Sequence, residues 1–442
     1  MSTTTQPRSM PDRIGKYRIE KELGRGATSV VYLAHDSFLK KPVAVKVADG
    51  SLIADAKHAS RLRYFLQTEA ALVGRFKHPH IVALLDAEID AERPYIVMEY
   101  IDGVSLDAHA TPDTLLPVPE VLDLVFQCCS ALEYALQLGL IHRDIKPANM
   151  LRPTDGGLKL TDFGTAQAST SERTQVSGMV GSPAYMSPEQ IREDKLTAQS
   201  DMFSLGVVMY QLLTGSLPFQ ADTDFAVIYK INYEEPQSLT QRRPGLSREL
   251  NAIVSKALSK KPEDRFASWG EFAEAISSIC QNLSTTDSKP QSAKLYRALR
   301  GNAFLSAFPD ASIWEVLNLG VPYHIHKDAV FMRERTAGAS FYILLEGEVS
   351  ISRNGREIAR VKPGETLGEM IYLNPSPPMR TATATATTEL MVLKIKCSSL
   401  RNANESLQGY FDRAFIRLLV DRLANASRRL ATLDDETFIQ IG

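Results

Sequence analysis

HRDIKPAN, residues 142–149, is the stretch that decides the fold of this chain. DFG at residues 162–164 and SPE at residues 187–189 follow it. GRGATSVV, residues 24–31, precedes it between two expected strands. Glycines at such a turn let the backbone close over phosphates, so that main-chain N–H groups can donate to them. Alone, the glycine segment would be an ordinary hairpin, but the four segments in this order point to one shared site.

Lys46 ends an apolar run in the strand expected over residues 43–47. A lysine at the end of such a strand requires a counter-charge, and Glu69 is the candidate, on the helix expected over residues 54–76. Together they would hold the α- and β-phosphates of a nucleotide. Without the later motifs, an exposed surface lysine would be the simpler interpretation.

These segments resemble the eukaryotic-type protein kinase family over about residues 14–279. The resemblance implies a bilobal fold that transfers a phosphoryl group from ATP to protein substrates. In that chemistry Asp144 orients the substrate hydroxyl and accepts its proton, and Lys146 stabilises the transferring γ-phosphate. Asn149 and Asp162 are the implied ligands of Mg²⁺, or of Mn²⁺, because these ions prefer oxygen donors. Lysine at position 146 resembles the serine/threonine branch, so a serine/threonine protein kinase is predicted.

The resemblance also implies an ATP site in which Met98 is the gatekeeper and residues 99–101 form the adenine hinge. Ser29 stands where the family usually has a third glycine. The residues expected to bind ATP are Leu23, Gly24, Gly26, Val31, Ala44, Lys46, Met98, Glu99 and Ile101.

Arg143 directly precedes Asp144, which in this family often accompanies control by phosphorylation of the loop after DFG. Thr170 and Thr174 are the first choices for that modification, and the alternative is that they are only solvated hydroxyls. Glu189 is expected to pair with Arg265 as a structural bridge.

Asp201, which opens an apolar helix, is the expected anchor of the catalytic loop. Ser182 stands in the implied substrate-facing loop, where threonine is usual.

A second region, after about residue 322, has strands separated by glycine turns and the segment GEM at residues 368–370. With Arg380-Thr381 it resembles the cyclic nucleotide-binding domain, a β-roll with flanking helices. The resemblance implies that Gly368 and nearby N–H groups face a cyclic phosphate. Glu369 would accept from the ribose 2′-OH, and Arg380 would neutralise the phosphate.

Two details qualify this second site. Met370 is expected to contribute through its backbone, and the Thr381 hydroxyl hints at cGMP rather than cAMP. The stretch between Glu369 and Arg380 is longer and richer in proline than the compact family form, which could shift Arg380 out of reach. We expect a cyclic nucleotide, cAMP or cGMP, bound at this domain to regulate the kinase. The alternative is a β-roll without ligand that docks a partner or dimerises the chain.

The bulk composition sets the remaining bounds. With 442 residues the chain is too long for one hydrophobic core, and its formal charge of −2 argues against a general nucleic-acid binder. No apolar run long enough for a membrane span occurs, so a cytoplasmic protein that is not membrane-bound is expected. The four cysteines, Cys128, Cys129, Cys280 and Cys397, are expected to be buried thiols.

The sequence thus predicts an α+β chain, a bilobal protein kinase fold followed by a cyclic nucleotide-binding β-roll. The expected segments are a disordered tail over residues 1–13, a kinase domain over 14–280, a linker over 281–292 and the second domain over 293–435.

Overall fold

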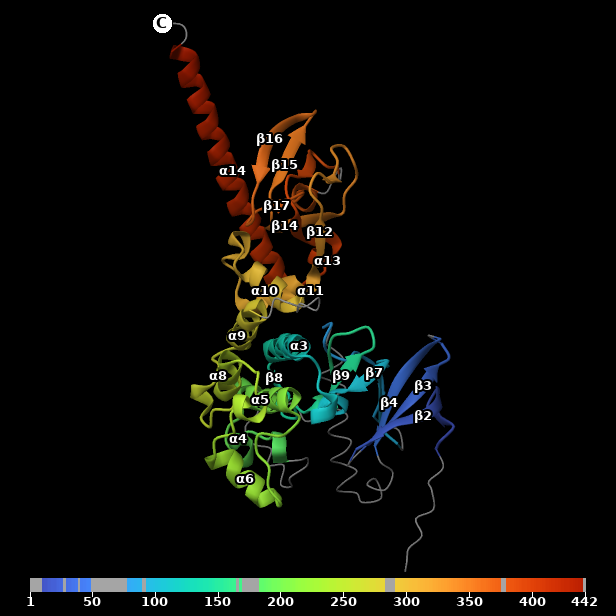
Figure 1. The fold of residues 1–442 in the computed structure, drawn as a ribbon. Coiled ribbons are helices and arrows are strands. Elements are labelled where there is room, and N and C mark those ends of the chain that lie inside the picture. The colour runs from blue at the N-terminus through green and yellow to red at the C-terminus, as the bar shows by residue number, and fades with distance from the viewer. Residues whose placement is uncertain are drawn as a thin grey trace, which may run out of the picture. The chain divides into compact units, whose positions relative to one another are not determined.

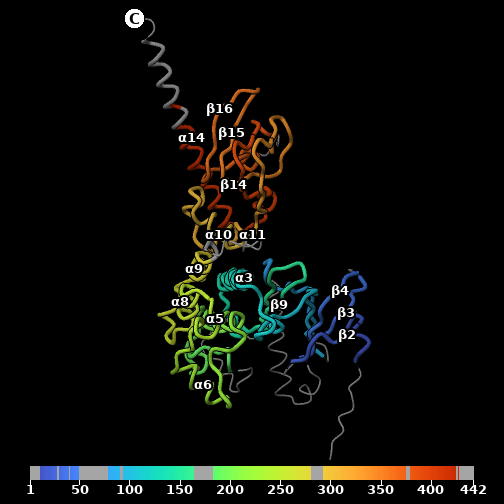
Figure 2. Tube along the Cα trace, viewed as in Figure 1, coloured from blue at the N-terminus to red at the C-terminus, as the bar shows by residue number. Residues whose placement is uncertain are grey.

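The computed structural model describes residues 10–26, 29–38, 40–48, 78–89, 93–163, 167–168, 183–282, 291–374 and 379–439. The chain divides into two compact units, residues 1–290 and 291–442, which are described separately (Figure 1). Figure 2 traces the course of the backbone through each unit. None of the helices in the described ranges is long and apolar enough to cross a membrane.

Unit 1 begins with an antiparallel sheet whose strands lie in the order β1-β2-β3-β4-β6-β5. The strands are β1 (Arg13–Ile14), β2 (Tyr17–Arg25), β3 (Ser29–Asp36), β4 (Lys41–Ala48), β5 (Leu84–Glu88) and β6 (Tyr95–Glu99). The strand expected over residues 43–47 lies within β4, and β2 and β3 are the two strands expected around the glycine segment. The helix expected over residues 54–76, with Glu69, lies outside the described residues.

The two faces of β4 separate packing from chemistry, because successive side chains of a strand point to opposite faces. Val43, Val45 and Val47 join the apolar cluster on one face of the sheet. Ala44 joins the cluster on the other face. Lys46 shares the face of Ala44 by the same alternation, and its side chain is only 12% exposed.

The rest of unit 1 is mainly helical and packs around α5. Its helices are α3 (Val118–Gln137), α4 (Pro188–Ile191), α5 (Ala198–Thr214), α6 (Asp224–Tyr233), α7 (Leu239–Arg242), α8 (Arg248–Ala257) and α9 (Trp269–Asn282). The helix α5 is almost wholly buried and contacts α3 and α8. Gly206 permits this close approach, since a Cβ there would lie 2.9 Å from the Cβ of Ala257. Gly215 ends α5 in the left-handed conformation, with φ +73°.

Short strands carry the motif-bearing loops between these helices. They are β7 (Gly103–Ser105), β8 (Leu140–Ile141), β9 (Met150–Pro153), β10 (Lys159–Leu160) and β11 (Gln167–Ala168). The 3-10 turns are Leu106–His109, Pro112–Thr114, Pro147–Asn149, Pro183–Tyr185 and Pro262–Asp264. In the described part of the chain, HRDIKPAN therefore lies between β8 and β9, and DFG begins just after β10.

Unit 2 is built on two antiparallel sheets, ordered β12-β19-β14-β17 and β13-β18-β15-β16. Their strands are β12 (Val321–Ile325), β13 (Val330–Met332), β14 (Ser340–Glu346), β15 (Val349–Arg353), β16 (Arg356–Val361), β17 (Thr366–Leu367), β18 (Thr383–Ala386) and β19 (Leu390–Lys396). One apolar cluster joins both sheets, with Leu344 and Val392 from one and Val349 and Ala384 from the other. The α+β fold class and the β-roll predicted from the sequence are confirmed.

Helices flank this roll. They are α10 (Gln291–Arg300), α11 (Asp310–Leu319), α12 (Met370–Leu373), α13 (Cys397–Arg401) and α14 (Glu405–Ile439), with a 3-10 turn at Ala303–Leu305. On α14, Phe411 and Phe415 are fully buried and pack on Phe341 of β14. Regular structure enters both ends of the expected linker, since α9 extends to Asn282 and α10 begins at Gln291. Cys128, Cys129 and Cys397 are buried free thiols, as expected, and the side chain of Cys280 lies outside the described part of the structure.

Candidate active site

Asp201, near the start of α5, anchors the catalytic loop through its carboxylate. The two carboxylate oxygens of Asp201 accept hydrogen bonds from the backbone N–H groups of His142 (2.7 Å) and Arg143 (2.8 Å). Arg143 adopts the left-handed backbone conformation, with φ +69°. A non-glycine residue there is strained unless its surroundings hold it, and Asp201 supplies that hold. Asp201 thus lies where the sequence placed it, beneath the loop that presents Asp144.

Two side chains of the loop contact the same carboxylate oxygen of Asp144. The Nζ of Lys146 lies 2.8 Å from Oδ2 of Asp144, and Nδ2 of Asn149 donates to the same oxygen at 3.0 Å. Asn149 also donates to the backbone oxygen of Asp144 at 2.8 Å. The side chains of Asp144 and Lys146 are 32% and 27% exposed. The carboxylate of Asp144 is therefore oriented by its own loop and remains within reach of a substrate.

Lys46 and Asp162 meet across the site as an ion pair. Burial alone would raise the pKa of Asp162, but the Lys46 ammonium, its hydrogen bond and nearby cations hold that pKa below its usual value. The backbone places Asp162 near the loop, because Thr161 N donates to the carbonyl of Asn149 at 3.0 Å. The ring of Phe163 packs on His142, with centroids 4.5 Å apart.

The residues expected to hold Mg²⁺ fit that ion chemically. Asn149 uses its amide nitrogen to contact Asp144, which leaves its carbonyl oxygen as the group that can face a cation. Asp162 contributes a carboxylate held in its charged form. Hard oxygen donors from an amide and a carboxylate suit Mg²⁺.

An apolar cluster lies beside these charges. It contains Ala44 and Met98, both buried, with Val31, Ile101 and Leu151 packed against them. Such a surface suits the flat face of an adenine ring. Leu151 was not predicted from the sequence, although it lies in β9 only two residues after Asn149, the expected metal ligand.

The remaining expected ATP residues differ in what their side chains do. Leu23 is 41% exposed. The carboxylate of Glu99 accepts from Ala83 N at 2.9 Å and from Lys159 Nζ at 2.6 Å, so only the backbone of Glu99 suits the hinge role. A Cβ at Gly24 would meet nothing within 4 Å, so the protein's own packing does not demand glycine there.

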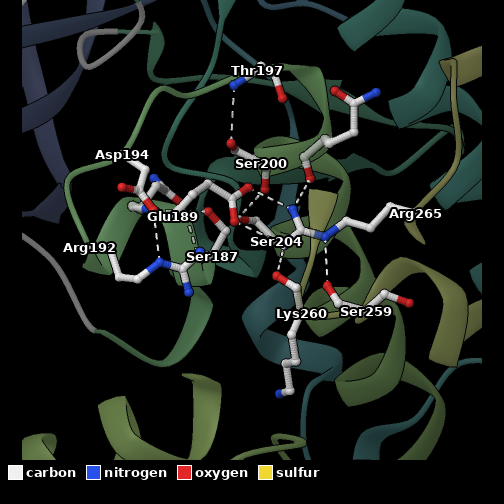
Figure 3. A network of polar contacts seen from close by, with 12 residues as sticks. Ser187, Glu189, Arg192, Asp194, Thr197, Ser200, Ser204, Ser259, Lys260 and Arg265 are labelled. Atoms are coloured by element: carbon white, nitrogen blue, oxygen red, sulfur yellow. Dashed lines mark hydrogen bonds and ion pairs between the residues drawn. The ribbon is translucent and has the colours of Figure 1, made fainter. Parts of the chain in front are cut away.

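A buried network joins the SPE segment to the helical part of the unit (Figure 3). Arg265 donates to both oxygens of Glu189, at 2.7 and 2.9 Å, and the two side chains are 0% and 2% exposed. Burial alone would raise the pKa of Glu189, but Arg265 lowers it below its usual value. Gln190 donates to the carbonyl of Arg143 at 2.8 Å, which ties this network to the catalytic loop. The geometry is that of the structural bridge expected from the sequence.

Several sequence predictions fall on residues outside the described ranges. Glu69, Thr170, Thr174 and Ser182 belong to this group. Their roles stay predictions.

In unit 2 the expected phosphate arginine lies against the expected glycine. Arg380 donates to the carbonyls of Ser340 (2.6 Å) and Gly368 (3.3 Å) and is only 9% exposed. Gly368 has φ +76°, and a Cβ there would collide with the Arg380 guanidinium. The proline-rich stretch has therefore not carried Arg380 away from the GEM segment. Met370 is 39% exposed, and Thr381 is also exposed.

Glu369, by contrast, is buried and already paired. Its Oε1 lies 2.6 Å from Nη1 of Arg422, a residue of α14. Its Oε2 accepts from the hydroxyl of Thr366 at 3.3 Å. Arg422 was not predicted from the sequence, because no motif or spacing connects it with a residue so far away in the chain.

Comparison with known proteins agrees with both units. A protein kinase domain model matches residues 17–280, and a cyclic nucleotide-binding domain model matches residues 323–406.

Serine/threonine-protein kinase PknB of Mycobacterium leprae is 41% identical over 274 residues, which cover 61% of this chain and 43% of that protein. A probable serine/threonine-protein kinase of Streptomyces coelicolor is 36% identical over 308 residues, covering 68% of this chain and 44% of that protein. The chain thus matches less than half the length of these curated relatives. The chain belongs to the protein kinase family, and its kinase domain is followed by a cyclic nucleotide-binding domain.

Proposed function

We propose that this chain is a serine/threonine protein kinase that transfers the γ-phosphate of ATP to protein hydroxyls. The observation that carries the proposal is the convergence of Asp144, Lys146 and Asn149 on one side of the site with the Lys46–Asp162 pair on the other. Phosphoryl transfer depends on positioning and on neutralising charge, and this arrangement offers both.

Each side chain has a defined task in this proposal. Asp144, oriented by Lys146 and Asn149, aligns the substrate hydroxyl and accepts its proton. Lys46 binds the α- and β-phosphates, exchanging its contact with Asp162 for them. Lys146 offsets negative charge on the transferring group. Asn149 and Asp162 hold Mg²⁺, which supplies further charge neutralisation when bound.

The choice of serine and threonine over tyrosine rests on Lys146 within HRDIKPAN and on the relatives, whose names describe serine/threonine kinases. Protein substrates are inferred from the same likeness.

Phosphorylation of the loop after DFG, at Thr170 or Thr174, is the first proposed means of control. Its support is Arg143, whose pKa is lowered by burial, which means that burial makes its positive charge costly. A phosphate beside Arg143 would offset that cost and stabilise the strained backbone next to Asp144.

The second proposed control is a cyclic nucleotide, cAMP or cGMP, bound at Gly368, Glu369, Met370, Arg380 and Thr381. Its support is the adjacency of Arg380 and Gly368, which would bring a cationic group and a left-handed turn to one phosphate. Coupling of this kind is reciprocal, so ATP would also change the affinity for the cyclic nucleotide. The burial of Glu369 favours the competing proposal, a ligand-free docking or dimerisation domain.

The experiment measures phosphate transfer to a generic basic protein with Mg²⁺ and ATP, with and without cAMP or cGMP. We expect turnover that Asp144→Ala reduces by about 10² to 10⁴-fold. Turnover that survives this change would contradict the kinase proposal. A change of rate with either cyclic nucleotide, lost in Arg380→Ala, supports direct regulation. A rate that ignores both nucleotides supports the docking domain.

A further inference from the structure

A side chain of the C-terminal helix reaches the expected nucleotide site. Arg422 of α14 contacts it with both terminal nitrogens, Nη1 to the Glu369 carboxylate at 2.6 Å and Nη2 to the carbonyl of Thr366 at 2.9 Å. A guanidinium donates through such a fork with fixed geometry, so the contact specifies direction as well as charge. Arg422 therefore joins α14 to Thr366 and Glu369, which lie before and after Gly368 in the chain.

Further contacts tie the same helix to α12, the short helix that follows Glu369. The hydroxyl of Tyr372 donates to Asp412 of α14 at 3.3 Å. The ring of Tyr372 lies 5.7 Å from that of Phe415, which is fully buried. Any shift of the segment between Glu369 and Tyr372 therefore acts on α14 at several points.

The position of Arg422 conflicts with the role expected of Glu369. A ribose 2′-OH can bind this carboxylate only by reaching one of its oxygens. Oε1 accepts from Arg422 and Oε2 from Thr366, and the Glu369 side chain is only 4% exposed. A buried carboxylate stripped of its partner is costly, so a ligand hydroxyl must replace what Arg422 supplies.

We propose that Arg422 is a built-in competitor of the ligand: α14 occupies the ribose-binding carboxylate, and a cyclic nucleotide binds by exchanging its 2′-OH for Arg422. This inference rests on the proposed cyclic-nucleotide function. Binding of the ligand and release of the Arg422 contact of α14 are then one event, so ligand binding changes how α14 is held on the β-roll. Only the molecules in which Arg422 has left Glu369 can bind the ligand. Because that fraction is small, the apparent affinity of the intact chain for the cyclic nucleotide is low.

The test uses the whole chain and titrates cAMP and cGMP by calorimetry. Arg422→Ala removes the competitor, and Arg417→Ala is the matched control, since Arg417 is an exposed arginine on the same helix. We expect Arg422→Ala to bind at least about tenfold more tightly, the effect of one hydrogen bond to a charged group. Arg417→Ala should bind as the unaltered chain does, and Arg422→Lys, which keeps charge without the fork, should fall between.

A 2′-deoxy cyclic nucleotide makes the test specific. It has no hydroxyl for Glu369, so the gain from Arg422→Ala should vanish. A weaker affinity in Arg422→Ala would show that Arg422 helps to hold the ligand and would overturn the competition. Equal affinity of the two chains for the ordinary nucleotide would overturn it as well.

Hydrogen exchange of the backbone amides of α14 supplies a readout that needs no ligand. Arg422→Ala should speed exchange around residues 411–424, and Arg417→Ala should not. If no chain binds either nucleotide, the cyclic-nucleotide function is wrong and the proposed competition is wrong with it. Faster exchange in Arg422→Ala alone would still show that the Arg422 contact stabilises α14. Unchanged exchange in Arg422→Ala would show that the contact does not stabilise α14 either.

Discussion

The two expected nucleotide sites use the same kinds of side chain but leave them in different states. In the kinase domain, Lys46, Asp144, Lys146 and Asp162 have side chains between 12% and 37% exposed. In the second domain the Glu369 side chain is 4% exposed, and the whole residue Arg380 is 9% exposed. Arg380 donates to backbone carbonyls, and Glu369 accepts from Arg422. The kinase groups pair with one another but stay partly accessible to a ligand. Glu369 is covered by Arg422 and must give up that partner before a ligand can reach it.

A third kind of charged contact sets the largest predicted effect. Glu189 and Arg265 are fully buried, so this pair should maintain the structure without touching a ligand. Arg265→Met leaves Glu189 buried without its counter-charge and should lower the free energy of unfolding of the kinase domain by about 3–5 kcal/mol.

Urea unfolding followed by a kinase-domain signal checks this, with Arg192→Met as control. Arg192 forms a surface pair with Asp194 in the same domain, so its loss should cost less than about 1 kcal/mol. Equal losses in the two variants would mean that burial does not separate structural from accessible pairs.

The accessible pair should matter for turnover rather than for folding. Lys46→Met removes a cation aimed at the expected phosphates, and kcat/KM should fall by about 10² to 10³-fold. Lys16→Met is the control, because Lys16 forms an exposed pair with Asp86 in the same lobe. A phosphorylation assay and a thermal melt of both variants separate the two effects. A large loss of stability with little loss of turnover would place Lys46 among the structural pairs.

Acid should weaken the kinase domain through two buried histidines. Burial, the main cause, lowers the pKa of His78 from 6.5 to about 3 and that of His80 to about 4. Below pH 6.5 the unfolded chain binds protons that the folded chain does not, so stability is full above that pH and falls as the pH is lowered. Between pH 7.5 and 5.5 each histidine should cost about 1.4 kcal/mol.

Urea unfolding at both pH values measures this, and His78→Gln/His80→Gln should flatten the dependence. The depressed carboxylates Asp162 and Glu189 release their protons below the pH range used. A slope that persists in the double variant would assign the acid sensitivity to other groups.

The smallest predicted effect concerns the hinge. Glu99 and Lys159 form a partly buried pair, with side chains 31% and 22% exposed. The pair links the end of β6 to β10, which leads to Asp162. Lys159→Met should raise KM for ATP about threefold to fivefold at nearly constant kcat, since a pair of this exposure contributes about 1 kcal/mol or less. Lys159→Arg should restore KM. Steady-state kinetics decide, and a fall in kcat alone would oppose a role at the hinge.

The sequence predicted what short motifs and alternation encode. Local patterns predicted the strand over residues 43–47 and the loop between β8 and β9. They also predicted the Asp201 anchor and the Glu189–Arg265 pair. Arg422 could not be predicted, because its contact with Glu369 depends on how α14 crosses the roll, and an arginine on a helix is usually solvated. Leu151 was not predicted as part of the ATP site, because an apolar residue in a short strand is most simply interpreted as a core residue.

The measurement that tests the contrast between the two sites most directly is the rate of ligand binding to each in the same chain. Stopped-flow mixing with fluorescent analogues of ATP and of a cyclic nucleotide provides it. The account predicts that the observed rate for the ATP analogue rises in proportion to its concentration. The rate for the cyclic nucleotide should level off, because Arg422 must leave Glu369 first. A rate for the cyclic nucleotide that rises linearly and as steeply as that for ATP would contradict the account.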